Sequence, residues 1–274
     1  WCAPEFLRAC VERLQQDPEV VLVAPRTRLF EADRAQATDY PGDIACMQPG
    51  PSDRLIHAGG YPRVHADALP PAVAMADYFA TYVERDLRQL VEVREIESFR
   101  RFVRLAAGRV GQLLNLHSLA ADAGVTDPTA RAWIDVLEAS FIVRRLQPWH
   151  ANIGKRLVKS TKLYFCDTAL AAWLIGIHEE AQLAAHPLRG ALFENMMVSE
   201  YLKYCRHQGL NHGLYFWRDN IGTEIDVVLE RGNHIAAIEI KSGPTVATDA
   251  FGALAKDGRF REDLYYRLSV LPVR

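Results

Sequence analysis

The sequence predicts a mixed α/β protein, an α+β arrangement in which helices precede a β-hairpin. Three observations support this fold class. Residues 75–114 repeat apolar side chains every three or four positions, which is typical of amphipathic helices. Residues 115–139 contain two shorter helical patterns separated by a glycine. Residues 222–243, "GTEIDVVLERGNHIAAIEIKSG", alternate apolar and polar side chains on both sides of a Gly-Asn pair, which is typical of a hairpin.

The bulk properties predict a cytoplasmic protein. Of the 274 residues, 49% are hydrophobic and 24% are charged, and the formal net charge is −2. This charge favours neither nucleic acid nor a membrane, so any basic surface must be local. The five cysteines are scattered without a CxxC pair, which indicates neither a zinc site nor a disulfide framework. No apolar run is long enough to span a bilayer, so we expect no membrane partner.

The N-terminal segment, residues 1–57, predicts a helix over 5–16, a strand over 20–23 and a polar, proline-containing loop over 33–53. Its phrase "DPEVVLVAPRTRLFEAD" resembles a segment of family-two glycosyltransferases. The segment lacks an acidic pair that could hold a metal and a nucleotide sugar, so we expect no activity from it alone. Because the chain begins with Trp1 rather than Met, we expect a fragment.

The next segment, residues 58–160, predicts a helical region with a winged helix-turn-helix. The long helical pattern has a break near Val93. A short helix over 118–123 then stops at Gly124, which suits a left-handed residue after a helix. Asp127 is the expected N-cap of a second helix that runs to about residue 139, with Pro128 at its first position. The strand-like "FIVRRL" follows as the wing.

A basic run begins in this wing and contains no acidic residue. Its members are Arg144, Arg145, Lys155, Arg156, Lys159 and Lys162. Such a run is a candidate site for the phosphates of DNA. Two other readings stay open, a solvated wing surface and a surface that docks against another domain of the same protein.

The segment over 161–246 predicts an α/β domain that ends in the hairpin. It begins with a strand over 162–165 and a helix for which Asp167 is the expected N-cap. A long helix over 186–210 and a strand over 214–220 follow. With a two-residue turn in the hairpin, Arg231 pairs with His234, and counting along the strands places Asp226 opposite Glu239.

Two carboxylates at facing positions destabilise a hairpin unless something compensates them. The candidates are a bound cation, a carboxyl group with a raised pKa, or the ammonium of Lys241, which lies on the same strand face as Glu239. On the helical wheel of residues 188–206, Glu194 lies within the apolar arc, whereas Glu200 projects towards the polar side. If this helix packs on the polar face of the hairpin, Glu194 joins the two strand acids, and an oxygen-only set of ligands suits Mg²⁺.

The order of a helix Glu, a strand Asp and a Glu-x-Lys on the next strand resembles the PD-(D/E)XK nuclease superfamily. The residues that carry this resemblance are Glu194, Asp226, Glu239 and Lys241. It implies a restriction-endonuclease-like α/β domain in which the three acids hold Mg²⁺ and the lysine helps to activate water. The other reading is that these are surface carboxylates on an edge hairpin.

Residues 58–246 also resemble the C-terminal half of a bacterial and archaeal AAA-type ATPase family whose tail is a conserved domain of unknown function. The phrases that carry the resemblance include "GGYPRVH", "TYVERDLRQL", "NIGKRLVKSTKLYFCDTALAAWLIGI", "HPLRGALFEN", "FWRDNIGTEIDVVLE" and "IEIKSG". The resemblance implies that an ATPase domain precedes the winged helix and that the tail has a nuclease-like fold. No GxxxxGK[ST] motif occurs, so we expect this chain to bind no ATP and an ATPase domain to be a missing partner.

The C-terminal segment, residues 247–274, contains "GRFREDLYYRLSV", which resembles bacterial enhancer-binding activators of the nitrogen sigma factor. The resemblance implies that Arg261 and Arg267 reach the nucleotide of a neighbouring subunit. Because the resemblances of residues 1–57, 58–246 and 247–274 point to unrelated families, we expect a fused or misassembled chain whose flanks make few contacts with the middle.

Two hypotheses about function remain. The first is a Mg²⁺-dependent nuclease-like domain attached to a winged helix. The second is a non-catalytic module that binds nucleic acid or a protein partner and keeps the acids as relics. An ATPase activity of this chain is disfavoured because the phosphate-binding loop is missing.

Overall fold

The structure is a computed structural model in which two compact units are distinguished, and each is described by itself. The helical unit comprises Pro51–Leu146 and Ser160–Ser199, and the strand unit comprises Trp1–Gly50, Gln147–Lys159 and Glu200–Arg274. The residues described are 20–21, 28–31, 34–39, 52–67, 69–81, 96–150, 160–207, 213–219, 221–231 and 234–240.

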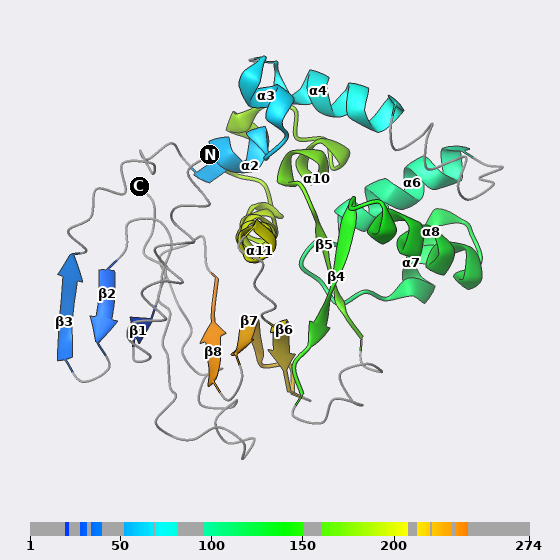
Figure 1. The fold of residues 1–274 in the computed structure, drawn as a ribbon. Helices are drawn as coiled ribbons and strands as arrows, with labels where there is room; N and C mark the ends of the chain where they lie inside the picture. Colours follow the sequence, from blue (N-terminus) through cyan, green and yellow to red (C-terminus); the bar gives the residue numbers. More distant parts are fainter. Residues whose placement is uncertain are drawn as a thin grey trace. The chain divides into compact units, whose positions relative to one another are not determined.

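The helical unit contains most of the helices, as Figure 1 shows. Three short helices come first, α2 (Ser52–Ala58), α3 (Pro62–Ala66) and α4 (Pro71–Tyr78). They are followed by α6 (Ile96–Ala107), α7 (Leu116–Ala123) and α8 (Asp127–Ala139). After strand β5 (Lys162–Phe165) come α10 (Thr168–Leu174), the 3₁₀ helix η2 (Glu180–Gln182) and α11 (Arg189–His207).

Helix α6 is held by one apolar face, as its sequence period predicts. Phe99, Phe102 and Val103 are fully buried, and the rings of both phenylalanines meet Trp133 of α8 edge-on at centroid distances of 5.2 Å. Aromatic pairs in this geometry add to the stabilisation that burial of their surface provides. The backbone of α6 is therefore fixed against α8. The expected break near Val93 lies outside the described residues.

The turn between α7 and α8 confirms one expectation and corrects another. Gly124 ends α7 with φ 76°, the left-handed conformation that glycine adopts without strain. The N-cap of α8 is Thr126 rather than Asp127, because the Thr126 hydroxyl accepts the backbone N–H of Thr129 at 3.3 Å. The Asp127 carboxylate instead contacts the ring of His117 at 3.0 Å.

Strand β4 (Val143–Pro148) runs antiparallel to β5, with Val143 opposite Phe165. The last two residues of β4 pair in parallel with β6 (Gly213–Arg218) of the strand unit. Strands β7 (Glu224–Arg231) and β8 (His234–Ile238) complete the order β5-β4-β6-β7-β8. The combination of helices and a mixed sheet confirms the predicted mixed α/β class.

The register of the hairpin is the one that counting from the turn predicts. Arg231 pairs with His234, and the ladder continues to Val227 opposite Ile238. The ladder ends there, and the next residues are Asp226 of β7 and Glu239, which directly follows β8, so their predicted facing placement stays a prediction.

A second, three-stranded sheet lies in the N-terminal segment. Strands β1 (Val20–Val21), β2 (Arg28–Glu31) and β3 (Arg34–Asp39) are antiparallel and follow one another in order. The predicted strand over 20–23 is confirmed in its first two residues. The predicted loop over 33–53 was wrong at its beginning, where β3 lies, and the expected helix over 5–16 falls outside the described residues.

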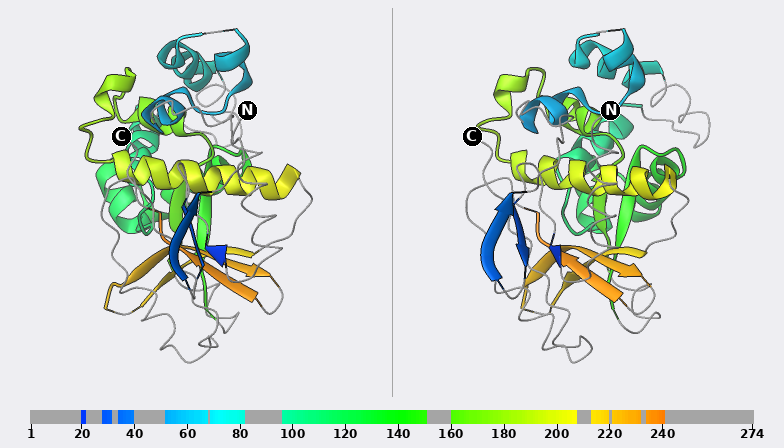
Figure 2. Two further views of the ribbon diagram at one scale, coloured as in Figure 1. Left: turned by 90° about the vertical axis from the view of Figure 1, so that its left-hand side faces the viewer. Right: turned by 60° about the vertical axis from the view of Figure 1, so that its left-hand side comes forward.

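Figure 2 shows α11 side-on as one continuous helix. It confirms the long helix expected around 186–210. Its Glu200, expected on the polar side, contacts Lys203 at 2.7 Å. None of the helices that the structure describes is long and apolar enough to cross a membrane.

Candidate functional site

The helical unit contains a buried ion pair that joins β5 to α11. The Lys162 ammonium donates to the Glu194 carboxylate at 2.9 Å, and the Tyr164 hydroxyl donates to the same oxygen at 2.5 Å. The Lys162 side chain is 2% exposed and the Glu194 side chain is 14% exposed. Buried carboxylates need such partners, because the loss of water is costly for an ion.

This pair corrects the prediction for Lys162. The residue was expected in an exposed basic run that contacts phosphates, yet its ammonium is enclosed and bound to a carboxylate. The physical reason is the strand in which it lies, because all four residues of β5 are buried. Glu194 lies on the buried side of α11, as the helical wheel predicts, but in the helical unit its charge is met by Lys162.

The strand unit holds the two hairpin acids. Asp226 is 5% exposed and Glu239 is 6% exposed, so neither is a surface carboxylate. The backbone N–H of Ile240 donates to the Asp226 carboxylate at 2.7 Å, which ties the end of β8 to β7. Val228 is also fully buried, so β7 is enclosed on both faces rather than on one.

The remaining predicted catalytic and metal-binding features stay predictions. Lys241 lies outside the described residues, as do Lys155, Arg156 and Lys159 of the basic run. Glu194 belongs to one unit, and Asp226 and Glu239 belong to the other. Within each unit, the described residues contain no group of three or more His, Cys, Asp or Glu side chains that could hold a metal ion.

The residues of the predicted basic run that lie in β4 carry little unpaired charge. Arg145 contacts Asp135 at 2.9 Å and Glu138 at 2.5 Å, both on α8, and Glu138 also accepts its backbone N–H. Arg144 is half-buried. A phosphate would have to compete with two carboxylates for Arg145, so its predicted role in binding nucleic acid has no support from its surroundings.

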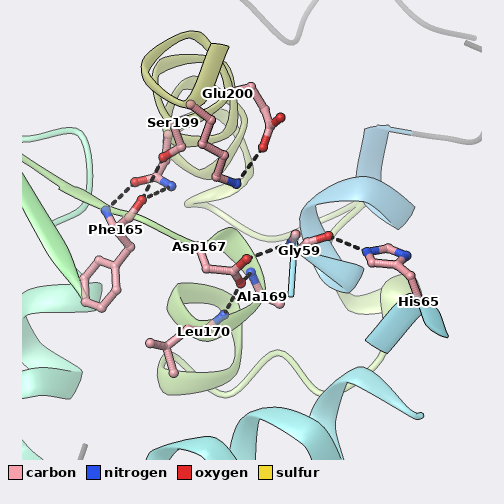
Figure 3. A network of polar contacts seen from close by, with 11 residues as sticks. Gly59, His65, Phe165, Asp167, Ala169, Leu170, Ser199 and Glu200 are labelled. Carbon is pink, nitrogen blue, oxygen red and sulfur yellow. Dashed lines mark hydrogen bonds and ion pairs between the residues drawn. The ribbon is translucent and has the colours of Figure 1, made fainter. Parts of the chain in front are cut away.

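A network of side chains fixes the end of β5, as Figure 3 shows. The amide of Asn195, on α11, accepts the backbone N–H of Phe165 at 2.6 Å and donates to its carbonyl at 3.0 Å. The Ser199 hydroxyl donates to the same carbonyl at 2.8 Å. Sequence reasoning missed both residues, although polar side chains four positions apart on the buried face of a helix are a signal for such bonds.

Asp167 connects the "GGYP" turn to α10. It is the N-cap that the sequence predicts and accepts the N–H groups of Ala169 and Leu170 at 2.9 and 3.2 Å, while Gly60 donates to its other oxygen at 2.7 Å (Figure 3). Gly59 has φ 65°, and a Cβ there would lie 2.4 Å from the carboxylate. Only glycine therefore fits this turn.

Next to this turn, Tyr61 lies against Tyr78 with ring centroids 4.7 Å apart. Burial raises the pKa of Tyr61 far above its ordinary value, and the nearby Asp167 carboxylate and a hydrogen bond with Tyr78 raise the pKa further. The phenol is therefore neutral throughout the physiological range and serves the packing of the turn.

Two family profiles match the chain, and neither is assigned a function. Residues 52–181 match a domain of unknown function (DUF8612), and residues 189–267 match a domain of unknown function (DUF4143). The second is associated with AAA-type ATPases, which links the chain to proteins of that type. This match continues past residue 246, where the predicted middle segment ends, to residue 267.

Two curated mycobacterial proteins are similar to this chain. The uncharacterized protein Rv2008c of Mycobacterium tuberculosis and the uncharacterized protein Mb2031c of Mycobacterium bovis are each 34% identical to it over 236 residues. The alignment covers 85% of this chain and 51% of each relative. The chain thus spans about half the length of the curated relatives it matches. No solved structure matches.

Proposed function

We propose that the chain is a C-terminal part of an AAA-type ATPase and that its strand unit is a magnesium-binding, nuclease-like domain. The observation that carries this proposal is the burial of Asp226 and Glu239, the residues next to the last pair, Val227 and Ile238, of one hairpin. Two buried carboxylates in this arrangement repel each other, and a divalent cation between them removes the repulsion.

The donor set fits Mg²⁺. Both side chains offer only oxygen atoms, and proteins commonly bind this ion through one or two carboxylates, with water and substrate phosphates completing the shell. Asp226 is oriented by the N–H of Ile240. When bound, Mg²⁺ would activate water and stabilise charge on a phosphodiester. In this proposal Asp226 and Glu239 hold the ion, and Lys241 is the neighbouring cation that the motif places on the same strand.

Glu194 is the third ligand in the nuclease pattern, and its contact with Lys162 bears on that role. Moving the carboxylate to a metal would leave a buried ammonium without its partner, which is costly. A site built on the two strand acids needs no such exchange. The proposal therefore rests on Asp226 and Glu239, with Glu194 as an additional ligand still to be tested.

A second candidate function is a non-catalytic module, and the Lys162–Glu194 pair favours it. If the helix acid serves only to hold β5 against α11, the acid cluster is a relic of an ancestral site. The ATPase part would then use this chain as a regulatory or docking segment.

Thermal unfolding with and without Mg²⁺ separates these functions. Ligand present at about 100 times its Kd stabilises the folded state by about 2.7 kcal/mol, so wild-type protein should melt at a higher temperature with Mg²⁺. Asp226→Asn should abolish this gain. Glu224→Gln is the matched control, because Glu224 lies on the same strand and pairs with Arg218 at 3.0 Å.

Cleavage of a labelled DNA duplex, measured in the same buffers, tests the chemistry. The nuclease-like proposal requires cleavage that depends on both Mg²⁺ and Asp226. An unchanged wild-type melting temperature in Mg²⁺ would refute the metal site and leave the non-catalytic module.

A further inference from the structure

Helix α6 presents arginines on the side opposite its apolar face. Arg100 and Arg101 lie on one turn, Arg104 lies on the next, and Arg109 follows just after the helix ends. The apolar face beneath them is fixed by Phe99 and Phe102 against Trp133. The arginine backbone positions are therefore set by the core, which lowers the entropy lost when a ligand binds.

These arginines line a surface cavity of about 460 Å³, together with Glu97, Leu105 and Gly108. Ligand-binding cavities in proteins span roughly 300 to 1,000 Å³, so the cavity is large enough for phosphate groups and part of a sugar.

The positive charge of this cavity is only partly compensated. Arg100 pairs with Glu97 at 2.5 Å, and Arg109 donates to Asp122 and, at 3.1 Å, to the Ser118 hydroxyl. Arg101 and Arg104 are exposed, and neither forms a hydrogen bond or an ion pair in the part of the chain that the structure describes. Arg101 and Arg104 thus differ from Arg145 of β4, whose guanidinium contacts two carboxylates of α8.

We infer that the arginine cavity of α6 binds the phosphate backbone of nucleic acid. Guanidinium groups match phosphate oxygens in a bidentate geometry. At a rise of about 1.5 Å per residue, Arg100 and Arg104 are about 6 Å apart along α6. Arg109 follows beyond the end of the helix, so the set extends farther than one small anion. The inference assigns the guanidinium groups to phosphate oxygens, and such contacts carry no sequence information by themselves.

This inference is independent of the proposed magnesium site, because it places the contact in the helical unit and requires no metal. It also differs from the predicted site in the basic run that begins at Arg144, since it assigns the contact to α6, which precedes α7 and α8. The test is therefore made in EDTA, which keeps magnesium off the protein. Any change in affinity then comes from the substituted arginines and not from the metal site.

The test measures the affinity of the full chain for a short labelled duplex of arbitrary sequence by fluorescence anisotropy over a range of salt. Two phosphate contacts contribute about 1.8 to the salt slope, at about 0.9 each. Arg101→Ala/Arg104→Ala should therefore bind more weakly and lower the slope by about two. The affinity difference from wild type should shrink about tenfold between roughly 50 and 200 mM salt, which a uniform structural defect would not produce.

Two control variants test whether the loss of affinity is specific to the arginines of α6 and to their charge. Arg54→Ala removes an exposed arginine on α2 and should leave binding unchanged, whereas Arg101→Lys/Arg104→Lys retains the charge and should retain most of the salt slope. Equal melting temperatures of wild type and the double alanine variant confirm that the fold is intact.

Two outcomes would overturn the inference. One is a double alanine variant with unchanged affinity and slope while Arg131→Ala, on α8, weakens binding. The other is saturable binding of free ATP at the cavity without binding of duplex, which would identify a nucleotide pocket instead.

Discussion

Replacement of Glu194 by Gln tests how the helical unit is held together. The side chain keeps its shape, but the Lys162 ammonium, 2% exposed, loses its carboxylate. Removal of one partner from a buried pair costs about 3–5 kcal/mol, and because Glu194 is 14% exposed we expect the lower end of this range, about 3 kcal/mol of unfolding free energy. Urea unfolding in EDTA measures this change in unfolding free energy. The dependence of the free energy on urea concentration should be the same in both proteins if unfolding is two-state.

The sign of this change separates an ion pair from a metal ligand. If Glu194 mainly opposes other acids in the metal-free protein, the neutral Gln removes repulsion and stabilises the fold. If it mainly neutralises Lys162, the same replacement destabilises the fold. The short distances from Glu194 to Lys162 and Tyr164 favour the second outcome.

A double-mutant cycle and a control on the same helix complete the experiment. Lys162→Met/Glu194→Gln should lose less stability than the two single changes add up to, with a coupling of about 1–3 kcal/mol. Glu200→Gln breaks the more exposed pair with Lys203 and should cost about 1 kcal/mol or less. If Glu194→Gln costs no more than Glu200→Gln, the buried pair does not hold β5 to α11 and the reasoning fails.

Two further substitutions test the left-handed backbone of Phe141 and the raised pKa of Tyr61. Phe141 has φ 58° and a side chain that is 61% exposed, at the position after α8 where glycine is preferred, so Phe141→Gly should raise the unfolding free energy by about 1 kcal/mol. Phe141→Ala keeps the strain and should give no such gain in the same denaturant titration. Because the folded state keeps the Tyr61 proton above about pH 10 while the unfolded chain releases it, wild-type stability should fall by up to about 1.4 kcal/mol per pH unit there from this group. Tyr61→Phe should remove that component, and parallel alkaline curves for the two proteins would contradict the raised pKa.

Local periodicity and turn chemistry were enough to predict much of the fold. Gly124 and Asp167 were identified from the preferences of single positions, and the hairpin register followed from a two-residue turn. The cap of α8 was missed because Thr126 and Asp127 are adjacent acceptors. In the structure the Thr126 hydroxyl accepts the N–H of Thr129, whereas Asp127 contacts His117, which is ten residues away in sequence.

The site was harder to predict because charge patterns do not reveal burial. Lys162 continues a basic run in the sequence, but its strand is enclosed, and the partner Glu194 is 32 residues away. The arginines of α6 were overlooked for the opposite reason. The spacing of apolar residues identified the buried face of the helix. The sequence does not show that the arginines on the other face line one cavity.

The pairing of Lys162 with Glu194 changes which residues a metal hypothesis needs. Sequence spacing gave equal weight to one helix acid and two strand acids, but the helix acid already has a cation and a phenol within hydrogen-bond distance. The strand acids are buried in a unit of their own, with one described backbone donor at Asp226. The case for magnesium therefore depends on whether these two carboxylates bind it without Glu194, and the Asp226→Asn melting experiment decides that independently of how the helical unit is stabilised.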